Sequence, residues 1–143
     1  MPSVQFRNAD QLFSFPNKTA LKTFIAKLFK REKRKLASLT YVFCSDEFLL
    51  QINRDHLKHD FYTDIITFDL SEQPQETIGE IYISLERIRD NAKTHQTSLK
   101  EETLRVLFHG ALHLCGYQDK SNGHIKQMRT KEAEYIALYL KQL

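Results

Sequence analysis

The sequence predicts an α+β fold: one compact domain over residues 1–143, with a mixed four-stranded sheet and helices packed mainly on one side. The length of 143 residues lies near the commonest size of a single domain and allows one buried core. Short runs rich in β-branched and aromatic residues are interspersed with longer segments of helical periodicity, without strict βαβ alternation. No linker rich in proline, glycine or serine divides the chain.

The expected elements follow from local patterns. Apolar residues repeat at helical spacing from Leu21 to Phe29 and predict a helix over residues 17–34. A β-rich run predicts a strand at Leu36–Cys44, and Asp46 is then expected to cap a short helix. The remaining strands are expected at about 3–7, 64–70 and 78–84, and the remaining helices at 85–95, 98–115 and 122–141.

Composition and cysteine usage predict a cytoplasmic protein. No stretch approaches the roughly 18 apolar residues that span a bilayer, so no membrane partner is expected. The beginning of the chain lacks a charged segment followed by a long apolar run, so no signal peptide is expected. Cys44 and Cys115 form no CxxC pair and are expected to be buried thiols, with a disulfide between them as the minor alternative.

Positive charge is concentrated in one segment. The net charge is only +3, but residues 27–35 (KLFKREKRK) hold six lysines or arginines against one glutamate. Such a patch can attract phosphates, whereas the alternative is the solvated outer face of a helix. The candidate substrate-binding residues in this segment are Lys30, Arg31, Lys33 and Arg34.

A metal-binding pattern lies near the C-terminal third of the chain. Residues 106–117 (VLFHGALHLCGY) contain no charged residue, which predicts a central, buried helix. His109 and His113 are one turn apart on it and can both face one ion. Gly116 predicts the helix end, and the turn that follows would bring Asp119 back over it. Three ligands would leave a position open for water, as in catalytic metal sites.

Alternatives to this pattern remain. Two core histidines bonded to backbone carbonyls would give the same spacing, although the glycine turn and the carboxylate favour a metal. Gly110 stands where metalloproteases of the H-E-x-x-H type have a glutamate base, which disfavours a protease. His124, eleven residues beyond His113, is the rival third ligand to Asp119. The expected cofactor is one divalent transition metal, with zinc first.

Three segments resemble the YbeY family of ribosomal-RNA-processing endoribonucleases. HGALHLCGYQD is similar to its signature H-G-x-L-H-L-x-G-Y-D-H, and IGEIYIS resembles its l-G-D-I-x-I-s strand. INRDHLKHDFYTDIITFDL resembles its L-N-x-x-Y-R-x-x-D-x-P-T-D-V-L-S-F stretch. The resemblance spans roughly residues 45–135. It implies a compact α+β fold with a zinc-like ion, hydrolysis of single-stranded RNA in the cytoplasm, and roles in ribosomal RNA maturation and ribosome quality control with the small ribosomal subunit.

Carried over by position, the family's first two ligands fall on His109 and His113. Its third histidine falls on Asp119, which is a departure from the family pattern. Two histidines and one carboxylate form a catalytic zinc set, but they also describe the iron(II) site of some oxygenases.

A second departure concerns the substrate. The family's arginine aligns with Leu57, so Lys58 or His59 would have to supply a positive group there. Thr63 and Asp64 match the family and are expected to border the cleft, although local turn chemistry explains them equally well.

Three hypotheses of function follow. The first is an endoribonuclease in which the metal activates a water; its general base is unassigned, with Asp64 and His59 as candidates. The basic segment would then hold the RNA backbone, and DNA is not an expected target. The second is a ribosome- or RNA-associated binding protein with a structural metal. The third is a metal hydrolase or oxygenase that acts on a small substrate.

Overall fold

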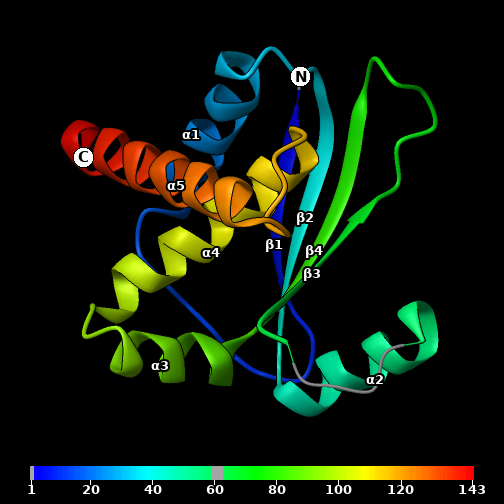
Figure 1. Ribbon diagram of the computed structural model, residues 1–143, viewed down its shortest axis with the longest axis vertical. Helices are drawn as coiled ribbons and strands as arrows, with labels where there is room; N and C mark the ends of the chain where they lie inside the picture. The colour runs from blue at the N-terminus through cyan, green and yellow to red at the C-terminus, as the bar shows by residue number, and fades with distance from the viewer. Residues whose placement is uncertain (1, 59–62) are drawn as a thin grey trace.

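The computed structural model describes residues 2–58 and 63–143, so the candidate base His59 lies outside the described residues. Every predicted helix and strand forms (Figure 1), and the ends that the sequence predicts by residue number lie within three residues of the observed ones. In chain order the elements are β1 (Ser3–Asn8), α1 (Lys18–Arg31), β2 (Leu36–Cys44), α2 (Asp46–Leu57), β3 (Ile65–Asp69), β4 (Thr77–Ser84), α3 (Leu85–Thr94), α4 (Leu99–Leu114) and α5 (Asn122–Gln142). The described helices include no candidate bilayer span.

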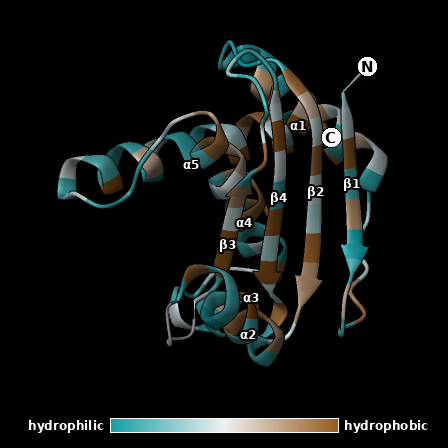
Figure 2. Cartoon of the chain, turned by 90° about the vertical axis from the view of Figure 1, so that its right-hand side faces the viewer, coloured by the Kyte–Doolittle hydropathy of each residue, from teal (hydrophilic) through white to brown (hydrophobic). Residues whose placement is uncertain are grey.

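The four strands form one mixed sheet in the order β1-β2-β4-β3. β1 pairs with β2 and β2 pairs with β4 in parallel, whereas β3 joins the edge antiparallel to β4. Figure 2 shows the strands side by side from their less covered face, with α2 across one end. The predicted mixed four-stranded sheet is therefore confirmed.

The main core lies between the sheet and the helices α1, α3, α4 and α5 (Figure 1). Alternate residues of the two central strands face this side, and Tyr41 and Ile81 are fully buried there. On the opposite face, α2 covers a smaller cluster through Leu49, which packs with Cys44 and Ile66. Helices thus cover mainly one side, as the sequence predicts.

Helix α4 is the central helix, in contact with α1, α3 and α5 and with strands β3 and β4. Leu107, Phe108 and Ala111 on it have no exposed surface. A Cβ atom at Gly110 would lie 2.7 Å from Cδ1 of Ile81 on β4. A larger residue here would therefore force the Ile81 side chain or the helix to shift.

The prediction that Asp46 caps α2 is wrong, because Ser45 is the N-cap. Ser45 has the extended backbone that a cap requires, and its Oγ accepts a hydrogen bond from the Phe48 N–H. Asp46 is already helical, and its carboxylate instead accepts hydrogen bonds from Ser84 Oγ (2.6 Å) and Arg87 Nε (3.1 Å).

Helix α1 ends three residues before the predicted end, because Lys33 adopts a left-handed backbone with φ of 61°. Glu32, the C-cap residue, accepts hydrogen bonds from the hydroxyls of Tyr117 (2.8 Å) and Tyr135, and Lys131 Nζ lies 3.7 Å from its carboxylate. Burial of this carboxyl raises its pKa, but the two tyrosine hydroxyls and Lys131 lower it more. The net pKa lies below its ordinary value of 4.5.

Glu32 should therefore stabilise the fold only while it is ionised. A depressed pKa in the folded state gives stability that is present above the ordinary value of 4.5 and is lost as pH falls through the folded pKa. We expect Glu32→Gln to lower the free energy of unfolding by about 1–2 kcal/mol at neutral pH, and by less in acid. Urea unfolding over a pH series measures this, with the exposed Glu72→Gln as the charge-matched control. A loss that does not depend on pH would contradict it.

Candidate metal centre

The two histidines of α4 and the loop after it bring three ligand atoms together. Nε2 of His109 lies 3.0 Å from Nε2 of His113. Oδ2 of Asp119 lies 3.3 Å from each of these nitrogens. The three side chains are partly buried, and among the described residues they form the one group of three or more such side chains that could hold a metal ion.

A tight turn after α4 returns the chain to the histidines. Gly116 has φ of 105°, and its N–H donates to the carbonyl of His113 (3.0 Å). The N–H of Tyr117 donates to the carbonyl of Leu112 (3.1 Å), which completes the Schellman pattern that ends a helix on a left-handed glycine. The structure thus places Asp119 over the last turn of α4, where the sequence predicts it.

Both imidazole rings are oriented by their other nitrogen. Nδ1 of His109 lies 2.5 Å from Oε2 of Glu132 on α5. Nδ1 of His113 lies 3.0 Å from the backbone carbonyl of Tyr117. A carboxylate and a carbonyl accept hydrogen bonds, so each Nδ1 is the donor and each Nε2 keeps its lone pair. This is the orientation that metal-binding histidines take.

A buried ionic network lies behind His109. Glu132 is only 2% exposed, and its Oε1 has no hydrogen-bond partner within the described chain. Nη1 of Arg105 lies 3.5 Å from this oxygen, and Nη2 of Arg105 lies 2.6 Å from the carboxylate of the buried Glu102 and 3.8 Å from that of Asp64. Burial lowers the pKa of Arg105, but these carboxylates raise it more, so the guanidinium stays charged.

No motif in the sequence points to Glu132, although a weaker signal exists. It lies on the buried stripe of α5, four residues after Met128 and three before Tyr135. A glutamate among apolar residues on a buried stripe indicates a paired carboxylate. Its partner is set by tertiary packing and is invisible in the sequence.

The three side chains open into a cleft of about 600 Å³ between α4, α2 and β3. Thr63 and Asp64, which the sequence predicts at the border of a cleft, line it, and Thr63 Oγ1 donates to the Ile65 carbonyl (3.3 Å). Leu57 lines it too, and so does Lys120, which was not predicted. The cleft therefore combines the candidate ligands with the polar side chains of Thr63 and Asp64, just before β3, and of Lys120, in the loop after α4.

Other predicted residues lie elsewhere. His124 is exposed in the first turn of α5 and lines a different hollow from that of His109 and His113. Lys58 is exposed at the left-handed end of α2. The four candidates of the basic segment lie at and beyond the end of α1: Lys30, Arg31, Lys33 and Arg34. They do not line the cleft either.

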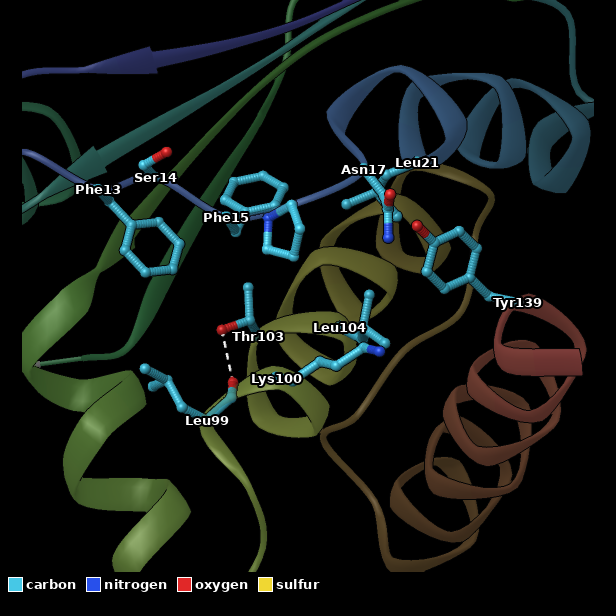
Figure 3. A pocket seen from close by; sticks show the side chains of 11 residues that line it. Phe13, Ser14, Phe15, Asn17, Leu21, Leu99, Lys100, Thr103, Leu104 and Tyr139 are labelled. Atoms are coloured by element: carbon cyan, nitrogen blue, oxygen red, sulfur yellow. Dashed lines mark hydrogen bonds between the residues drawn. The ribbon is translucent and has the colours of Figure 1, made fainter. Parts of the chain in front are cut away.

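Two other features offer no comparable chemistry. Cys44 and Cys115 are buried free thiols, and burial raises the pKa of each to about 12. A cavity of about 210 Å³ lies between α1, α4 and α5, with mostly apolar side chains around Lys100 (Figure 3). Thr103 in its wall donates its hydroxyl to the Leu99 carbonyl (2.7 Å), as Figure 3 shows.

Comparison with known proteins identifies the family. A family model described as Endoribonuclease YbeY matches residues 4–139. A protein of Cytophaga hutchinsonii named Endoribonuclease YbeY is 43% identical over 136 residues, 95% of each chain. A protein of the same name from Flavobacterium johnsoniae is 42% identical over 132 residues, 92% of this chain and 94% of its own.

The fold is also found in a solved structure. The solution structure of TM1509 from Thermotoga maritima aligns with a TM-score of 0.61 at 23% identity, covering 97% of this chain and 90% of that one. This likeness confirms the fold, and the family model and the relatives confirm the resemblance seen in the sequence. The chain belongs to the Endoribonuclease YbeY family.

Proposed function

We propose that the protein is a metal-dependent endoribonuclease, specific for single-stranded RNA, that acts in ribosomal RNA maturation and ribosome quality control. We place it in the cytoplasm, in association with the small ribosomal subunit. One observation carries the proposal: two oriented histidines and a carboxylate converge in a cleft, in a chain whose relatives are named endoribonucleases.

The ligand spacing supports a single metal ion held by His109, His113 and Asp119. Two ligands that bind zinc tetrahedrally at about 2.0–2.1 Å are themselves about 3.3 Å apart. The three distances between the candidate ligand atoms are 3.0, 3.3 and 3.3 Å. We propose zinc as the ion that these three side chains would hold.

With zinc bound, the residues around it would have separate roles in orienting the ligands, accepting a proton and binding the substrate. A bound zinc ion supplies Lewis acidity and a water of lowered pKa. Glu132 and the Tyr117 carbonyl hold the two imidazoles so that their Nε2 atoms face Asp119. Asp64 lines the same cleft and is the candidate proton acceptor, while Lys120 can pair with a phosphate of the substrate.

Metal content tests the ligand set. We expect about one zinc per chain in the wild-type protein, prepared without an affinity tag. Asp119→Ala should lose the metal, because two histidines alone leave the site short of a ligand, whereas His124→Ala should keep it. Elemental analysis of the three proteins gives the answer. Loss of metal in His124→Ala with retention in Asp119→Ala would show that the rival ligand is the real one.

Glu132 should set the affinity of the site for its metal. Glu132→Gln removes the carboxylate that orients His109, and we expect zinc affinity to fall about 10-fold or more. The matched control is Glu134→Gln, which removes a charge from a half-buried position of the same helix that pairs with Arg31 and Lys131 and does not contact His109. Competition with a chelating dye measures both affinities. Equal affinities for the two variants would exclude the orienting role.

Cleavage of RNA tests the reaction itself. We expect zinc-loaded protein to cut end-labelled single-stranded RNA and to leave a duplex intact. Chelation, or His109→Ala in a protein that circular dichroism shows to be folded, should reduce the rate about 100-fold or more. If the loaded protein binds RNA without cutting it, the binding-protein hypothesis with a structural metal is the better account.

A further inference from the structure

A second polar hollow lies on the other side of the turn that carries Asp119. Its volume is about 320 Å³, and it opens between the connection from α1 to β2, the loop from α4 to α5, and the start of α5. The side chains and backbone that line it come from Glu32, Arg34, Cys115, Gly116, Tyr117, Gln118, His124 and Gln127. The loop of residues 115–120 therefore separates this hollow from the metal cleft, with Gln118 on one side and Asp119 on the other.

The guanidinium of Arg34 rests on the glycine turn. Its Nη2 lies 2.9 Å from the position that a Cβ atom on Gly116 would occupy. Among the residues that the structure describes, Arg34 forms no ion pair, although Glu32 lines the same hollow. The Glu32 carboxylate is already engaged by Tyr117, Tyr135 and Lys131. Arg34 thus presents an exposed guanidinium that is unpaired within the described part of the chain, and a guanidinium is well suited to a phosphate.

Arg34 also links this hollow to a basic groove. The groove runs along the end of α1 and the start of β2, and its lining includes Lys27, Lys30, Lys33, Arg34 and Lys35. All five are exposed. The groove and the hollow share Arg34, and the loop of residues 115–120 connects the hollow to the metal cleft. Figure 1 shows that α1 ends and β2 begins at the same end of the molecule.

The basic residues at the end of α1 differ in whether an acidic side chain of the protein already pairs with them. Arg31 is paired with Glu134 at 3.2 Å and is turned toward α5. Lys30 and Lys33 form no ion pair in the described ranges, 2–58 and 63–143, and their charge is available to a ligand. Three of the four substrate-binding residues predicted in the basic segment therefore line the groove, and Arg31 does not.

We infer that one RNA strand follows a track from the metal cleft across the Gly116 turn, with a backbone phosphate on Arg34 and further phosphates along Lys30 and Lys33. The inference rests on the proposed function for the identity of the strand as RNA. Contacts with backbone phosphates position the strand but do not depend on its base sequence. They also give a role to the cations outside the cleft, in addition to Lys120 within it.

Binding without metal tests the track separately from catalysis. A labelled oligouridine of about 12 nucleotides is titrated with chelated, metal-free protein over a salt series. Removing three phosphate contacts from a single strand should reduce the slope of log affinity against log salt by about 2. We expect this for the triple variant Lys30→Ala, Lys33→Ala, Arg34→Ala.

The matched control has the same change in charge elsewhere. Lys18, Lys93 and Lys100 are exposed at other helix ends, and their triple alanine variant should keep the wild-type slope. Equal slopes for the two triple variants would overturn the track. Equal competition by an oligoglutamate of the same charge would also overturn it and would assign the groove to an acidic protein.

Cleavage of short and long RNA adds a positional test. With zinc-loaded protein, Arg34→Ala should lower kcat/KM about 10-fold more for a 12-nucleotide than for a 4-nucleotide substrate, since only the longer strand reaches Arg34. Arg34→Lys should restore part of this difference. An equal loss on both lengths would contradict the track. A wild-type protein that binds RNA with the predicted slope but never cleaves it would refute the proposed nuclease and leave the track standing.

Discussion

The close approach of α4 to β4 is the constraint on which the candidate site depends. A Cβ atom at Gly110 would lie 2.7 Å from Ile81, and one at Gly79 would lie 2.5 Å from Leu114, so that larger residues would force these side chains or the helix to shift. With the helix held there, its apolar face is buried. His109 and His113 then emerge beside β3, in the cleft. The position of the histidines is thus a consequence of core packing.

A histidine must also be correctly oriented to bind a metal, and the flanking helices orient the imidazole rings of His109 and His113. On one side α5 places the buried Glu132 against Nδ1 of His109. On the other side, Glu32 at the end of α1 holds the Tyr117 hydroxyl, and the Tyr117 carbonyl accepts from Nδ1 of His113. Burying Glu132 is unfavourable by itself, and the nearby Arg105 offsets much of that cost. Contacts within the chain itself therefore hold both rings in the orientation that a metal ligand needs.

Features with a local signature could be predicted from the sequence, and features made by tertiary contact could not. The helices and strands follow from periodicity. Asp119 follows His113 by only six residues, so its approach to the histidines follows from the Gly116 turn between them. The contact of Glu132 with His109 joins residues 23 apart, and that of Glu32 with Tyr117 joins residues 85 apart, so no motif contains them. The contact of Arg34 with the Gly116 turn also cannot be predicted from the sequence.

The N-cap of α2 is a local feature that the sequence nevertheless predicts wrongly. Ser45 and Asp46 are both good capping residues, and only the backbone conformation decides between them.

We propose that two imidazoles and one carboxylate hold one ion, with Asp119 in place of the third histidine of the family signature. X-ray absorption spectroscopy at the zinc edge of the loaded protein tests this most directly. Two imidazole nitrogens and further oxygen ligands at about 2.0–2.1 Å, with both imidazoles kept in His124→Ala, are the predicted result. Three imidazoles around the zinc, or a sulfur ligand at about 2.3 Å, would contradict the account.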